Sequence, residues 1–143
     1  MRTVLYVQAA ASLAMAGVIW MVQLVQYPGF LLVGAAEFPA FHAAHSQRIT
    51  LVVGPLMAIE GLTALWILVA RPSGVPPWAA LLGLGLLGVA LATTMFVSVP
   101  LHGRLTTAWD AEAIRRLVAT NWIRTAAWTA RGVLSLWMLS AAR

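Results

Sequence analysis

The run ITLVVGPLMAIEGLTALWILVA (residues 49–70) decides the fold class, because it is apolar along its length and Glu60 is its one charged residue. A helix needs about 20 such residues to cross the hydrocarbon core of a bilayer. Three further runs of similar character, residues 4–25, 78–99 and 117–142, lie before and after it. The sequence therefore predicts an all-α protein with four membrane-spanning helices, which form a single domain over residues 1–143.

The composition supports lipid as the surrounding solvent. The chain is 62% hydrophobic and 9% charged, whereas a soluble domain carries about 25% charged residues. Its net charge of +5 comes from nine basic residues, all arginine, and four acids. A nucleic-acid-binding surface would need these arginines in one patch, but they are scattered among apolar runs. We therefore expect the lipid bilayer as a partner and no nucleic acid. The absence of cysteine excludes disulfides, thiolate metal sites and cysteine nucleophiles.

The connections predict the topology. RPSGVPP (residues 71–77) is rich in helix breakers and indicates a tight turn, and four antiparallel spans form an up-down-up-down bundle. Residues 28–48 and 100–116, which hold all three histidines, then share one membrane side, called side B here. We expect residues 36–48 to form an amphipathic segment at the side-B interface, with the second helix beginning inside it. Asp110 has the features of a helix start that runs on into the fourth span.

The histidines are the candidate metal ligands. His42 and His45 are three residues apart and share a face of a helix, and His102 ends the third span on the same side. Three imidazoles can bind Cu, Fe or Zn, and two from different helices can bind a haem iron. A polar cluster at the interface without any cofactor and a proton-transfer role without metal are the alternatives. Glu60 is a poor co-ligand, since about 27 Å of helix separates it from His42.

Glu60 and Arg131 are predicted to form a buried ion pair. A charge at the centre of a bilayer costs at least about 2.5–3.5 kcal/mol, so it should be paired or neutral. Both residues lie about 18–22 Å from side B if the helices are regular. The pair either ties the second span to the fourth or takes part in proton transfer or substrate contact.

Polar residues near side B predict a site inside the bundle. On the fourth span they recur at offsets of 0, 3, 7 and 10, which is one helical face: Asn121, Arg124, Trp128 and Arg131. Arginines in a membrane helix should face the bundle interior or a wet cavity. At the end of the first span, Gln23 and Tyr27 also share a face. We expect Gln23, Tyr27, Asn121 and Arg124 to bind a polar group of a substrate. Alternatively, Arg124 extends to the side-B interface and Tyr27 lies at that interface.

Several motifs resemble those of small bacterial four-helix membrane proteins and, more distantly, of the anthrone oxygenase-like membrane family: QYPGF, FHAAHSQRI, VGPLMAIE, VPLH and NWIRTAAWTARG. The resemblance touches all four predicted helices. It implies the same four-helix fold, a multi-pass location that we expect to be the bacterial inner membrane, and the oxidation of small aromatic compounds. It assigns no catalytic role to His42, His45 or His102.

Three functions fit the sequence. The first is a metal- or haem-dependent oxidoreductase that acts on a small amphipathic substrate. The second is a non-enzymatic binding or carrier protein for a small amphipathic ligand, which predicts an apolar-walled cavity. The third is a structural subunit of a membrane complex, which predicts a filled core and a flat Gly/Ala face on the third span. The sequence has no nucleophile constellation and no paired carboxylates, so it does not decide whether the protein is an enzyme. A homo-oligomer is compatible with all three.

Overall fold

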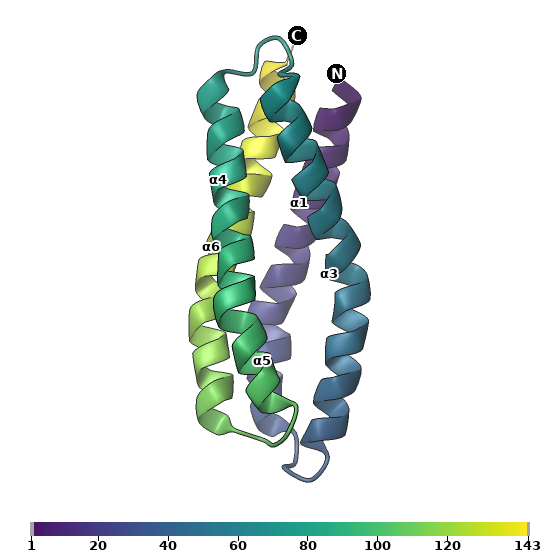
Figure 1. Ribbon diagram of the computed structural model, residues 1–143, viewed down its shortest axis with the longest axis vertical. Helices are drawn as coiled ribbons and strands as arrows, with labels where there is room; N and C mark the ends of the chain where they lie inside the picture. Colours follow the sequence, from purple (N-terminus) through teal and green to yellow (C-terminus); the bar gives the residue numbers. More distant parts are fainter. Residues whose placement is uncertain (1, 143) are drawn as a thin grey trace.

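The computed structural model describes residues 2–142, which are helical apart from the turns and contain no strand (Figure 1). The chain forms four rods, two of them built from several helical segments. The first rod comprises α1 (Arg2–Met21), η1 (Val22–Gln26), α2 (Tyr27–Gly29) and η2 (Phe30–Leu32). The second is α3 (Phe38–Val69), the third comprises α4 (Pro77–Thr93), η3 (Thr94–Ser98) and α5 (Val99–Leu105), and the fourth is α6 (Ala111–Ala141).

The rods run up, down, up and down, as the sequence predicts. Both chain ends and the turn between α3 and α4 lie at one end of the bundle, and the other two connections lie at the opposite end, which is side B (Figure 1). The second helix begins inside residues 36–48, as the sequence predicts. Because α3 begins at Phe38 and continues without a break to Val69, this segment forms the first turns of the second rod.

Three rods are long and apolar enough to cross a membrane: Arg2–Leu32, Phe38–Val69 and Pro77–Leu105. The predicted spans 4–25, 49–70 and 78–99 fall on them. Their outer faces are apolar, and on α3 the exposed fractions of Leu51, Leu62 and Val69 are 76%, 70% and 87%. Apolar surface of this extent is rarely left in contact with water, so lipid is its natural solvent. The predicted fourth span, residues 117–142, falls on α6, which is not among these three. This rod has the most polar sequence and buries many of its side chains in the bundle.

Two π-helical turns interrupt the rods near side B. η1 precedes Pro28 and η3 precedes Pro100, and the residue directly before each proline donates its N–H to the carbonyl five residues back. Proline lacks an N–H and its ring clashes with the carbonyl four residues earlier in a regular α-helix, so a wider turn accommodates it. The extra residue also rotates the following side chains by about 100° about the helix axis. Tyr27 and His102 follow these turns and face the interior of the bundle.

A buried polar network joins all four rods mid-way along the bundle. Arg131 Nε donates to Glu60 Oε1 at 2.9 Å, Trp128 Nε1 donates to Glu60 Oε2 at 2.8 Å, and Ser12 Oγ donates to Oε1 at 2.6 Å. The Arg131 guanidinium also donates to the Gly83 carbonyl. These residues come from α1, α3, α4 and α6, and the Glu60 and Arg131 side chains are at most 1% exposed. Apolar clusters lie on both sides of this network.

The first prediction concerns this ion pair. Replacing Arg131 by Met leaves the Glu60 carboxylate buried without its counter-charge, and loss of one partner of a buried pair costs about 3–5 kcal/mol. The double variant Glu60→Gln, Arg131→Met removes both charges and should recover most of that loss. Unfolding of the purified protein in detergent measures both values. Arg116→Met, which removes an exposed arginine of α6, is the matched control and should change stability by less than about 0.5 kcal/mol. Equal instability of the single and double variants would contradict this prediction.

The second prediction concerns the start of α6. Asp110 Oδ1 accepts the backbone N–H groups of Glu112 and Ala113, each at 3.0 Å. These bonds, that of Ala113 foremost, and the nearby Arg104 guanidinium hold the pKa of Asp110 below its usual value. A lowered folded-state pKa gives stability that is complete above the unfolded pKa of about 3.9 and is lost as the pH falls through the folded pKa. The melting temperature of Asp110→Asn should therefore fall less between pH 7 and about pH 3 than that of the wild type. An equal fall in the two proteins would contradict this role of Asp110. Asp110→Ala should melt earlier at both pH values.

Candidate functional site

Between the Glu60 network and side B, the bundle holds a cavity of about 260 Å³. Its walls are mainly apolar and come from the first three rods: Met15, Val18, Ile19, Val22, Ile49, Val53, Met57 and Val99. Its polar groups include Tyr27, His45, Ser98, His102 and Arg124. An apolar chamber with a few convergent polar groups is the usual form of a site for a small organic molecule.

Arg124 is the charged group of this cavity. Its side chain is 6% exposed, so it faces the bundle and does not extend to the side-B interface. Its NH1 group donates to Asn121 Oδ1 at 3.0 Å, to Ser98 Oγ at 3.2 Å and to the Tyr27 hydroxyl at 3.4 Å. The guanidinium carbon lies 5.4 Å from the centre of the Trp128 ring, a distance at which a cation is attracted to the ring face.

Arg124 has no acidic partner among residues 2–142. The ion pairs of that part of the chain are Arg104 with Asp110, Arg115 with Glu112 and Arg131 with Glu60. Its Nε is buried without a hydrogen-bond partner in the described residues. A buried charge is costly unless it is paired, so this guanidinium gives the cavity a strong preference for an anionic or electron-rich oxygen.

Gln23 and Asn121 do not line the cavity. They are connected to Arg124 by hydrogen bonds. Asn121 Nδ2 donates to Gln23 Oε1 at 2.9 Å, and Gln23 Nε2 donates to the Val118 carbonyl at 3.1 Å. Thr125 Oγ1 also donates to Gln23 Oε1, at 3.2 Å. Of the four residues that the sequence predicts to contact a substrate, the structure places Tyr27 and Arg124 at the cavity. Asn121 bonds to Arg124 directly, and Gln23 bonds to Asn121.

The three histidines gather at the side-B end of the cavity, together with Tyr27. The Tyr27 hydroxyl shares a hydrogen bond of 3.0 Å with His102 Nε2, and His102 Nδ1 shares one of 2.9 Å with His42 Nε2. The His45 ring lies 6.1 Å from that of His102 and 6.4 Å from that of His42. The Phe30 ring contacts all three imidazoles. His42 is fully buried and lies outside the cavity lining.

This arrangement differs from that of a preformed metal centre. Ligand nitrogens lie about 2.0–2.1 Å from a bound metal ion and point toward it. Here His42 and His102 direct ring nitrogens at each other, and the second nitrogen of His102 faces Tyr27. Within the described residues, no group of three or more His, Asp or Glu side chains is arranged to hold a metal ion. This geometry gives the metal and haem hypotheses no support.

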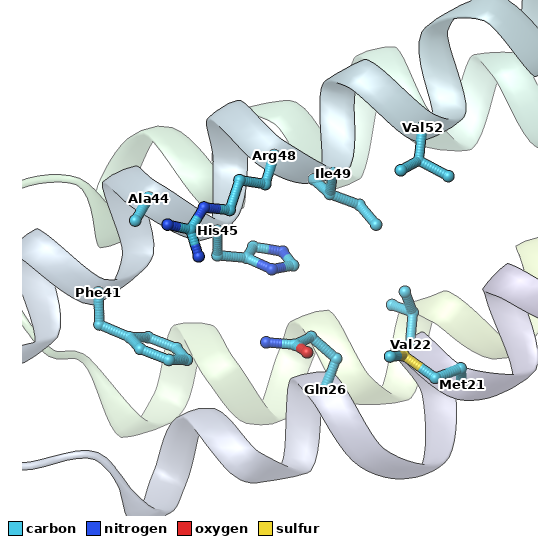
Figure 2. Close-up of a pocket in the computed structure, with 9 residues that line it drawn as sticks. All are labelled: Met21, Val22, Gln26, Phe41, Ala44, His45, Arg48, Ile49 and Val52. Carbon is cyan, nitrogen blue, oxygen red and sulfur yellow. The ribbon is translucent and has the colours of Figure 1, made fainter.

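A second, outer pocket of about 320 Å³ lies between α3 and the side-B half of the first rod. Figure 2 shows the side chains of α3, among them Phe41 and Arg48, facing Gln26 and its neighbours across this pocket. Three residues line both this pocket and the inner cavity: Val22, His45 and Ile49. They form the wall between the two spaces.

Ser98 is a site residue that sequence reasoning missed. It is 3% exposed, lines the cavity and accepts a hydrogen bond from Arg124. Its signal in the sequence is weak, because it is one of two hydroxyl residues, with Thr94, in the otherwise apolar run TMFVSVP.

Comparison with protein-family models, with curated proteins and with solved structures finds no match to this chain. The resemblance to the anthrone oxygenase-like family stays a prediction, and any assignment of function rests on the residues of the cavity.

The third prediction concerns metal content. The mutual hydrogen bonding of His42 and His102 predicts that the wild type, His42→Ala and His102→Ala carry equal amounts of metal after purification in detergent. Elemental analysis and an absorption spectrum measure this. Metal or a Soret band that is present in the wild type and lost in both variants would contradict the prediction and establish a histidine-ligated centre.

Proposed function

We propose that this chain is a multi-pass membrane protein that binds a small amphipathic molecule inside the bundle, with an anionic or electron-rich oxygen of that molecule facing Arg124. One observation carries the proposal. Arg124 is a buried cation at the polar end of an apolar cavity, and no carboxylate pairs with it among residues 2–142.

The cavity limits the size of the ligand. Ligand sites usually measure about 300–1,000 Å³, and an engineered apolar cavity of about 150 Å³ accommodates benzene. A volume of about 260 Å³ therefore suits a body of one or two rings or a short branched chain. The walls contribute apolar contact, which stabilises binding by about 25 cal/mol per Å² of apolar surface buried.

The polar end of the cavity limits the chemistry of the ligand's head. Arg124 supplies charged donors, the Tyr27 hydroxyl can donate or accept, and His102 presents an imidazole. A carboxylate, phenolate, enolate or quinone-like carbonyl satisfies these groups. An alkylammonium head would place a second cation beside Arg124, so we exclude it from the ligand class.

The outer pocket supports a route from the membrane to the cavity. It lies on the side of the bundle between the first rod and α3, whose outer faces are apolar, and Val22, His45 and Ile49 line both it and the inner space. Gln26 and Arg48 give it a polar rim. An amphipathic molecule from the lipid phase can meet this rim first and reach Arg124 after His45 changes rotamer.

The cavity also bears on the other two functions. A structural subunit is expected to have a filled core, so a cavity of this size disfavours that function. Oxidation of a bound substrate stays a prediction, since no observation on the described residues supplies a redox group. Binding of an amphipathic molecule is a step that such an enzyme would share with a binding protein.

The fourth prediction tests the cavity. Val53→Phe adds a ring to the inner wall, so the site with its ligand bound would be overfilled, at a cost of about 1–3 kcal/mol, or about 5- to 150-fold in affinity. Leu51→Phe adds the same kind of bulk to the lipid-facing side of α3, where Leu51 is 76% exposed, and serves as the control. Organic extraction and mass spectrometry of purified protein should find an amphipathic compound in the wild type and Leu51→Phe that is depleted in Val53→Phe.

A companion variant tests the charge. Arg124→Met removes hydrogen bonds to a charged group, which are worth about 1.5–3 kcal/mol, or about 10- to 150-fold in affinity. Acidic or carbonyl-bearing compounds should be lost from this variant, and Arg116→Met should retain them. Equal recovery of the same compounds from the wild type, Val53→Phe and Arg124→Met would contradict the proposed function.

A further inference from the structure

A chain of hydrogen bonds leads from the cavity to a histidine that is shielded from it. Arg124 NH1 donates to the Tyr27 hydroxyl, that hydroxyl bonds to His102 Nε2, and His102 Nδ1 bonds to His42 Nε2. The distances are 3.4, 3.0 and 2.9 Å. The last member, His42, is 0% exposed, and its Nδ1 has no partner among the described residues. Structural polar clusters usually satisfy every buried group, so the open end of this chain points to a function.

The chain has two consistent arrangements of protons. A neutral imidazole carries one N–H group and one bare nitrogen. In the first arrangement the Tyr27 hydroxyl donates to His102 Nε2, His102 Nδ1 donates to His42 Nε2, and the remaining proton of His42 is on Nδ1. In the second arrangement His42 Nε2 donates to His102 Nδ1, and His102 Nε2 donates to the Tyr27 oxygen, which directs its own proton toward the cavity. Protons can therefore move along the chain without movement of the backbone.

We infer that this chain removes a proton from the bound molecule, so that the site acts as a general base on an acidic hydroxyl group. The inference rests on the proposed function, because it requires a ligand in the cavity. Its substrate class is an apolar molecule with a phenolic or enolic O–H.

The step balances in atoms and charge. Starting from the first arrangement, the ligand's O–H proton passes to the Tyr27 oxygen, and the original Tyr27 proton passes to His102 Nε2. The Nδ1 proton of His102 passes to His42 Nε2. The products are the ligand anion beside Arg124, neutral Tyr27 and His102, and a His42 imidazolium with protons on both nitrogens. The net charge of the site is unchanged, since one anion and one cation form together.

Burial of His42 opposes a charge on its imidazole, and two contacts offset part of that cost. The new anion lies beside Arg124, which has no other anionic partner among residues 2–142. The new cation lies against the face of Phe38, whose ring stacks on that of His42 at 5.6 Å and 25°, and an aromatic face attracts a cation. The other titratable group facing the chain is His45, from the same rod as His42. Because His42 is shielded from the cavity and from solvent, the proton is retained in the protein.

The test uses a short-chain alkyl nitrophenol, whose phenolate absorbs at a longer wavelength than its phenol. Protein in detergent is titrated with this probe in weak buffer, at a pH where the probe in empty micelles is the neutral phenol. The absorption spectrum reports the form of the bound probe, and a pH electrode reports protons released to the medium. We expect the wild type to bind the probe as phenolate with no proton released, because His42 retains the proton.

Two variants interrupt the chain without removing Arg124. His42→Phe removes the final acceptor, which lies outside the cavity lining, and Tyr27→Phe removes the first hydroxyl. Both should form about tenfold less phenolate than the wild type, and Tyr27→Phe should also bind the probe more weakly, because Tyr27 lines the cavity. Tyr6→Phe is the matched control, since Tyr6 is the one other tyrosine of the chain and is 58% exposed. It should behave as the wild type.

The contradicting results are distinct from those for the proposed function. A wild type that binds the probe as neutral phenol, or as phenolate with release of one proton per probe, would overturn the proton chain and leave the binding function intact. The measurement on the wild type alone therefore tests the proton chain, even if a variant fails to fold. Absence of probe binding to the wild type would overturn both proposals.

Discussion

The buried pair of Glu60 and Arg131 is the interaction on which the rest of the structure depends. Charges in an apolar bundle must find partners inside it, and Glu60 obtains them from Ser12, Trp128 and Arg131 while Arg131 reaches Gly83. The four rods are therefore held in one axial register. Arg124 lies seven residues before Arg131 on the same face of α6, about 10 Å closer to side B. Arg131 is neutralised by a carboxylate of the chain, whereas Arg124 is held by neutral groups.

The bundle has a filled half and a half that contains the cavity. From the Glu60 network to the chain ends, the interior is filled by an apolar cluster. Toward side B, the interior holds the cavity, Arg124 and the hydrogen-bonded chain of Tyr27, His102 and His42. The π-helical turns η1 and η3 occur in this half, and such turns are frequent at functional sites because they redirect side chains. Proline supplies the local reason for each turn, so the same two prolines also set which side chains face the cavity.

Much of the fold could be predicted from the sequence, because bilayer thickness and helical rise act on long runs of residues. The depth of Glu60 and Arg131 follows from 1.5 Å per residue, and the convergence of three histidines follows from antiparallel topology. What could not be predicted depends on local rotation and packing. The turns before Pro28 and Pro100 change which side chains face inward, and a cavity is the space that side chains leave unfilled. Sequence spacing also cannot tell imidazoles that bind one metal from imidazoles that bond to each other.

We propose that Arg124 receives its counter-charge from a molecule in the cavity. An experimental structure of the protein, determined in lipid after incubation with the compound extracted from it, tests this most directly. The account predicts density for a compact molecule among Met15, Val53 and Met57, with an oxygen within hydrogen-bond distance of the Arg124 guanidinium. A cavity closed by side chains, or an Arg124 that pairs with a lipid head group at side B, would contradict it.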